Sequence, residues 1–109
     1  MIGDATHINL TQHTYFNLDG LATLPSSGVL DAIAQLSSSR YLIADADTLP
    51  TGEIANVAGT VFDFREARAV LPRGESEESF GGYDHAFVLD DSLPFAARVF
   101  SPVRGGTFG

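Results

Sequence analysis

The sequence predicts an all-β fold, organised as a sandwich of short strands. Segments of strand length are separated by clusters of Gly, Pro, Ser and Asp along the chain. Strands do not alternate with long helical patterns, so a βαβ architecture is not indicated. At 109 residues, the chain is expected to form a single domain over residues 1–109.

The first element is a strand predicted over residues 7–18, whose side chains alternate between two faces. One face carries hydrogen-bonding groups, an aromatic ring and an imidazole, from Asn9, Thr11, His13, Tyr15 and Asn17. The other face carries the apolar residues Ile8, Leu10, Phe16 and Leu18, with Gln12 and Thr14 between them. The apolar face suits a protein core, and the polar face suits a polyhydroxylated ligand such as a sugar.

The later elements follow as short strands and turns. Turns are predicted at residues 19–20 and 25–28. Residues 29–36 stay open between helix and strand, because their apolar positions recur at helical spacing and include alanines. Residues 73–79 are acidic and polar, which predicts a mobile loop. Further strands are expected at residues 41–44, 57–64, 86–89 and 95–100, with breaks at Pro50, Gly52, Gly59 and Pro94.

Charge and composition exclude several classes of function. A net charge of -8, with six basic residues that are all Arg, argues against nucleic acid and against an anionic membrane surface as partners. No apolar run approaches the ~20 residues that span a bilayer, and residues 1–4 show no signal-peptide pattern. The absence of Cys excludes disulfides, thiolate metal sites and thiol nucleophiles. A cytoplasmic protein is therefore expected.

Three motifs, in order along the chain, resemble one known family. They are Asn-Leu-Thr-Gln-His-Thr-Tyr-Phe-Asn-Leu at residues 9–18, Leu-Pro-Thr-Gly-Glu at 49–53 with Gly-Thr-Val-Phe-Asp-Phe-Arg at 59–65, and Gly-Gly-Tyr-Asp-His-Ala-Phe-Val-Leu at 81–89. Together they look like the aldose 1-epimerases, the galactose mutarotase family. The resemblance implies a galactose mutarotase-like β-sandwich (supersandwich), incomplete in this chain, and it implies a strand at residues 29–36.

The resemblance also implies roles for residues in the first and third motifs. His13 would be the general acid that protonates the ring oxygen of a hexose such as galactose or glucose, because imidazole titrates near neutrality. Asp84 would bind sugar hydroxyls. Tyr15 and Asn17, about 7 and 13 Å along the strand from His13 at a rise of ~3.3 Å per residue, are expected to contact the substrate. The structural alternatives are a half-buried strand histidine, an aspartate that caps its own turn, and a tyrosine packed in the core.

The remaining polar groups are assigned to structure. His85 is expected to point away from the face of Asp84. Asp63 and Arg65 are expected to form a structural ion pair, and Glu53 is assigned to a structural turn. No metal site is expected, because the acidic residues fail the calcium-loop spacing and no His-x-x-x-His pair occurs. No cofactor is expected.

The family pattern extends beyond both ends of this chain. The resemblance places an arginine and a second histidine upstream, and the base glutamate downstream. The expectation is a fragment that is inactive or nearly so, since losing the base costs about 10²–10⁴-fold in rate. The alternatives are a non-catalytic carbohydrate-binding domain, or a structural half that needs a partner chain. Open strand edges would favour self-association.

Overall fold

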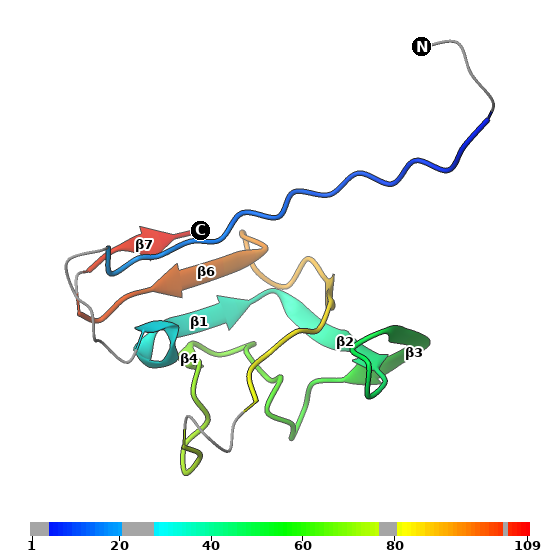
Figure 1. Cartoon of the computed structure of the whole chain (residues 1–109). Coiled ribbons are helices and arrows are strands. Elements are labelled where there is room, and N and C mark those ends of the chain that lie inside the picture. The colour runs from blue at the N-terminus through cyan, green and yellow to red at the C-terminus, as the bar shows by residue number, and fades with distance from the viewer. Residues whose placement is uncertain (1–4, 21–27, 77–80, 104) are drawn as a thin grey trace.

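Two antiparallel sheets make up the computed structural model, which describes residues 5–20, 28–76, 81–103 and 105–109 (Figure 1). One sheet has the order β4-β1-β6-β7 and the other has the order β3-β2-β5. The prediction of an all-β chain is confirmed. A short 3₁₀ helix, η2 (Gly28–Asp31), precedes the strands. The strands are β1 (Ile33–Leu36), β2 (Ser38–Ala44), β3 (Pro50–Asn56), β4 (Arg68–Ala69), β5 (Phe87–Leu89), β6 (Ala97–Phe100) and β7 (Thr107–Phe108).

The two sheets are joined through Ser37, the one residue between β1 and β2. In Figure 1, β1 runs directly into β2. The Ser37 side chain is fully buried, its Oγ donates a hydrogen bond to the carbonyl of Asp90, and it accepts one from the Leu93 amide at 3.2 Å. The Asp90 carboxylate in turn accepts hydrogen bonds from the amides of Ser39 (2.8 Å) and Ser92 (3.3 Å). The loop after β5 is thereby tied to the point where one sheet passes into the other.

Because of these hydrogen bonds, the free energy of unfolding is expected to depend on pH in the acid range. Hydrogen bonds from Ser92 and Ser39 lower the pKa of the Asp90 carboxyl from 3.8 to about 2. A depressed pKa contributes stability that is fully present above pH 3.8 and is lost as the pH falls from there through about 2. In thermal melts between pH 5 and 2, Asp90→Asn is therefore expected to show a smaller drop in Tm than the wild type. Asp91→Asn should follow the wild-type curve, and a wild-type slope in Asp90→Asn would contradict the assignment.

In the middle of the chain, the structure has turns where a strand was predicted, and a strand where a break and a turn were predicted. Residues 57–64 were expected to form a strand, but they form successive turns, with the Thr60 amide donating to the Val57 carbonyl at 3.0 Å. The strand lies instead at β3, where Pro50 and Gly52 predicted a break and Glu53 a turn. Proline is tolerated because β3 is an edge strand, and Gly52 adopts a φ of 92° opposite an irregular register.

A tight hairpin connects β2 to β3. The Asp45 carboxylate accepts hydrogen bonds from the amides of Asp47 (2.9 Å) and Leu49 (3.0 Å), while Thr48 adopts a left-handed φ of 63°. An aspartate that caps its own turn is common in such loops. Asp45 therefore stabilises the connection between β2 and β3.

Residues 5–17 form an extended arm rather than the predicted first strand. In the described part of the chain the arm makes no strand pairing, and Figure 1 shows it running from beside β7 away from both sheets. A β-strand needs a neighbour to satisfy its amides and carbonyls. The arm has the extended conformation of a strand but does not pair with a neighbouring strand, so the strand prediction is wrong for this structure.

The other predicted elements are found with shifted bounds. Residues 29–36 divide into η2 and β1, while β2, β5 and β6 confirm the strands expected at 41–44, 86–89 and 95–100. The turn at residues 19–20 is present. Of the loop expected at 73–79, residues 73–76 are irregular and 77–79 lie outside the described residues. The turn expected at 25–28 also falls mostly outside them. The two-residue strands β4 and β7 were not predicted.

Few apolar side chains are buried. In the described ranges, the apolar residues that form the core are Ala32, Ala34, Val57 and Phe64. The radius of gyration is 16.4 Å, against about 13 Å for a compact chain of this length. Ile8 and Leu10 on the arm are 77% and 89% exposed. The chain thus leaves much of its apolar surface in water. None of the helices in the described ranges has the length and apolarity needed to cross a membrane.

Candidate functional site

His13 lies on the exposed arm, next to Tyr15. The two rings stack, with centroids 5.0 Å apart and planes inclined by 23°. Residues two apart in an extended chain share a face, so the predicted alternation is present even without a sheet. Tyr15 is 87% exposed, which excludes the core-packing alternative here. The imidazole is therefore open to solvent and supported on one side by an aromatic ring.

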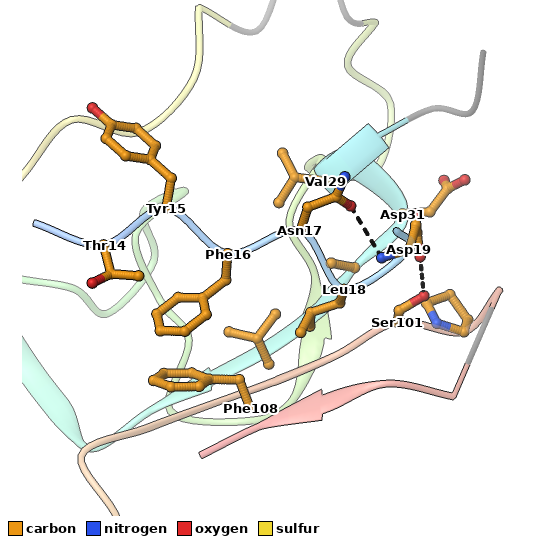
Figure 2. A pocket seen from close by; sticks show the side chains of 13 residues that line it. Thr14, Tyr15, Phe16, Asn17, Leu18, Asp19, Val29, Asp31, Ser101 and Phe108 are labelled. Atoms are coloured by element: carbon orange, nitrogen blue, oxygen red, sulfur yellow. Dashed lines mark hydrogen bonds between the residues drawn. The ribbon is translucent and has the colours of Figure 1, made fainter. Parts of the chain in front are cut away.

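A groove of 460 Å³ lies where the arm meets the first sheet, between residues 14–19, η2 and strands β6 and β7 (Figure 2). Phe16 packs against Phe108 of β7, with ring centroids 4.1 Å apart. Figure 2 shows Tyr15 on the other side of the arm from Phe16. Phe16 thus anchors the arm to β7, while Tyr15 points away from it.

Asn17 takes part in a turn at the end of the arm. Its Oδ1 accepts a hydrogen bond from the Asp19 amide at 3.1 Å, and its Nδ2 donates to the Gly20 carbonyl at 3.3 Å. The Ser101 hydroxyl donates to the Asp19 carboxylate, which fixes the turn on the loop after β6 (Figure 2). Asn17 lines the groove, but its amide is already occupied by the turn.

Asp84 is exposed between two half-buried aromatic neighbours. Tyr83 and His85 both contact the ring of Phe62, with centroid distances of 5.7 and 4.4 Å. Because successive side chains of an extended segment point in opposite directions, Asp84 faces outward. The prediction that His85 points away from the face of Asp84 is consistent with this arrangement. The Asp84 carboxylate is therefore accessible from solvent.

The structure does not join His13 to Asp84. Neither residue lines the groove, and the ring contact of His13 is with Tyr15 on its own arm. The arm belongs beside β7 of one sheet, whereas Asp84 precedes β5 of the other. Of the four predicted site residues, Tyr15 and Asn17 share the groove and His13 adjoins Tyr15, while Asp84 stands apart.

Asp63 and Arg65 form the predicted ion pair. Arg65 Nε and Nη2 donate to the two carboxylate oxygens of Asp63 at 2.8 and 2.7 Å. These hydrogen bonds lower the pKa of Asp63. The pair lines a polar cleft of 600 Å³ together with Glu66 and Arg68. Both partners are satisfied by each other, which supports the structural interpretation.

Glu53 and the other acidic residues do not assemble into a metal centre. Glu53 is exposed on edge strand β3. Among residues 5–20, 28–76, 81–103 and 105–109, no group of three or more His, Asp or Glu side chains could hold a metal ion.

Arg68 is a residue that the sequence left unplaced. Its guanidinium lies 4.1 Å above the ring of Phe64 and donates to the hydroxyl of Tyr83 at 3.2 Å. Its carbonyl partners belong to residues 61 and 63 and, at 3.4 Å, to the neighbouring residue 69. No sequence pattern marks these partners, because main-chain carbonyls are present at every residue.

The chain is similar to known sugar epimerases over most of its length. Residues 2–106 match the family model described as Aldose 1-epimerase. Human galactose mutarotase is 39% identical over 103 residues, which are 93% of this chain and 29% of that protein. Aldose 1-epimerase of Escherichia coli is 37% identical over 100 residues, 86% of this chain and 28% of that protein. The chain therefore spans less than a third of these relatives.

Solved structures support the same likeness. The crystal structure of the aldose epimerase homologue from C. elegans aligns with a TM-score of 0.69 at 28% identity, covering 84% of this chain and 27% of that chain. The galactose 1-epimerase of Lactobacillus acidophilus aligns with a TM-score of 0.57 at 32% identity, covering 67% and 23%. The two sheets described above are thus a recurring arrangement.

Proposed function

Because this chain belongs to the aldose 1-epimerase family, we propose that it carries part of a site that interconverts the α and β anomers of a hexose such as galactose or glucose. His13 is the general acid. It protonates the ring oxygen as the anomeric hydroxyl loses its proton, the ring opens, the carbonyl carbon turns, and the ring closes on the other face. Asp84 accepts hydrogen bonds from sugar hydroxyls and so orients the ring.

One observation carries this proposal. The family match runs through both His13 and Asp84, and both side chains are exposed, each beside an aromatic residue that limits its direction. Tyr15 supports the imidazole and is placed to contact an apolar face of the sugar. Asn17 is proposed as a further contact, although its amide would have to leave the turn with Asp19 and Gly20.

The proposed mechanism needs a base that no described residue supplies. The resemblance expects a glutamate from a later segment of the family pattern. Glu53 is not a substitute, because it lies on the exposed edge of β3. We propose that residues 1–109 act as one partial β-sandwich domain, and that the domain works in carbohydrate metabolism in the cytoplasm.

Two alternatives share the same sugar-facing residues or the same fold. A non-catalytic carbohydrate-binding domain would keep Asp84 and dispense with proton transfer. A structural half that pairs with another chain is supported by the unpaired arm and by exposed Ile8 and Leu10. A chain that stays monomeric at every concentration in size-exclusion chromatography would exclude pairing between copies of itself.

Sugar binding is tested by titrating the ¹⁵N-labelled chain with galactose and with glucose. We expect the amide resonances around His13 and Asp84 to shift, and Asp84→Asn to weaken binding by about 10-fold or more, the range for a hydrogen bond to a charged group. Asp91→Asn removes a carboxylate from a neighbouring exposed loop and should bind like the wild type. If no resonance near either residue moves at saturating sugar, the proposed site is wrong.

A further inference from the structure

The backbone that carries Asp84 is not held by a sheet. Strand β5 begins at Phe87, and before it the described residues 81–86 make no strand pairing. Gly81 and Gly82 adopt φ values of 33° and 85°, a region that other residues rarely enter. The carbonyl of Ala86 accepts a hydrogen bond from the Leu42 amide at 2.9 Å, at the end of the segment nearest β5. Asp84 therefore depends on side chains for a fixed direction.

Aromatic packing supplies part of that support. The ring of Tyr83 meets Phe62 and Phe64 edge-on, with centroids 5.7 and 5.1 Å apart. His85 packs against Phe62 at 4.4 Å and against Tyr41 at 5.9 Å. These contacts hold the residues on both sides of Asp84 against the turns of residues 61–64 and, through Tyr41, against β2. Aromatic packing alone still permits the segment to slide, because it has little directionality along the chain.

Arg68 supplies hydrogen bonds, which fix the position of this segment more specifically than ring packing does. Its Nε donates to the carbonyl of Asp63 at 2.8 Å, and its Nη2 donates to the carbonyl of Val61 and, at 3.2 Å, to the hydroxyl of Tyr83. The Tyr83 hydroxyl donates in turn to the same Val61 carbonyl at 2.8 Å. The guanidinium plane also covers the ring of Phe64 at 4.1 Å. One half-buried side chain on β4 thus connects the turns of residues 61–64 to the residue before Asp84.

We propose that Arg68 and the Tyr83 hydroxyl are positioning residues, which fix the direction of the Asp84 carboxylate toward its ligand. The inference rests on the proposed function of Asp84 in sugar binding. A planar guanidinium is needed for this role, because its fork reaches two carbonyls and a hydroxyl while its face lies on an aromatic ring. Neither residue touches the sugar.

Tyr83→Phe is the sharpest test, because it removes the hydroxyl and keeps the ring contacts. We expect the ¹⁵N order parameter of Asp84 to fall from about 0.85 toward 0.6 or below, and the dissociation constant for galactose to rise roughly 3- to 10-fold, the range for one net hydrogen bond. Tyr41→Phe is the matched control. It lies in the same aromatic cluster, and its hydroxyl makes no hydrogen bond to the described residues.

Arg68→Lys provides a second variant, which keeps the charge and loses the fork. It should also lower the order parameter at Asp84 and weaken galactose binding. Unchanged order and affinity in both variants would overturn the proposal, and so would an equal loss of order in Tyr41→Phe, which would indicate general loosening. If the wild-type chain binds no galactose, the proposed function fails, while the order parameters still decide whether Arg68 and Tyr83 position Asp84.

Discussion

Replacing Phe64 by alanine is expected to lower the free energy of unfolding by about 3–5 kcal/mol. Phe64 is 4% exposed, and its ring contacts Tyr83, Phe87 and the Arg68 guanidinium. Alanine leaves a cavity in a core that has few other buried side chains to close it. A loss of this size is comparable to the whole stability of a small domain, so the variant is expected to be unfolded at 25 °C. Collapse of its ¹H–¹⁵N spectrum would be the evidence.

Phe108→Ala is the matched control for this experiment. Phe108 is 41% exposed. Its replacement by alanine removes chiefly the packing against Phe16, and such an aromatic pair is worth about 0.5–1.5 kcal/mol. Its spectrum should keep its dispersion. Equal effects of the two substitutions, measured by urea denaturation, would mean that Phe64 is not the centre of the core.

The second large effect concerns the reaction itself. We expect the 109-residue chain to accelerate the mutarotation of freshly dissolved α-galactose, followed by polarimetry, about 10²–10⁴-fold less than the Escherichia coli relative does. The reason is that general acid and general base act on the same sugar in concert, and the chain offers His13 without a base among its described residues.

His13→Ala separates the remaining explanations. If any acceleration above the buffer rate is seen, the substitution should abolish it, whereas His7→Ala, on the same arm and outside the proposed site, should leave it unchanged. Acceleration equal to that of the longer relative would show that a base lies within these residues, and the mechanism proposed here would be wrong.

Local patterns predicted the elements in part. Strands β2, β5 and β6 follow from short apolar runs bounded by turn residues. The strand was expected at residues 57–64 because Val57, Val61, Phe62 and Phe64 are residue types that favour strands. In the structure, Val57 and Phe64 lie in or beside turns and are buried there. Proline and glycine mark breaks in a central strand, but on an edge strand they are tolerated, and edge position is a property of the whole sheet.

The candidate site could likewise be predicted only in part from the sequence. His13 and Asp84 could be singled out because they sit inside recognisable motifs, and the outward direction of Asp84 follows from simple alternation. The role of Arg68 could not be predicted, since it depends on carbonyls and a hydroxyl from two other segments, residues 61–63 and residue 83. The alternation of polar and apolar side chains predicted the extended conformation of the arm. It could not predict that the arm is unpaired, because pairing depends on which neighbouring strands are present.

The passage of β1 into β2 through Ser37 has a mechanical consequence. The arm with His13 packs on β7, in the sheet that contains β1. The segment with Asp84 leads into β5, in the sheet that contains β2, and is also tied to β4 of the first sheet through Arg68. Because β1 passes into β2 at this one residue, a rotation of the backbone there would move the acid relative to the carboxylate. Burial of Ser37 and its bonds to the loop after β5 act against that rotation, and they place the alignment of the proposed site under the control of a residue that lies in neither half of it.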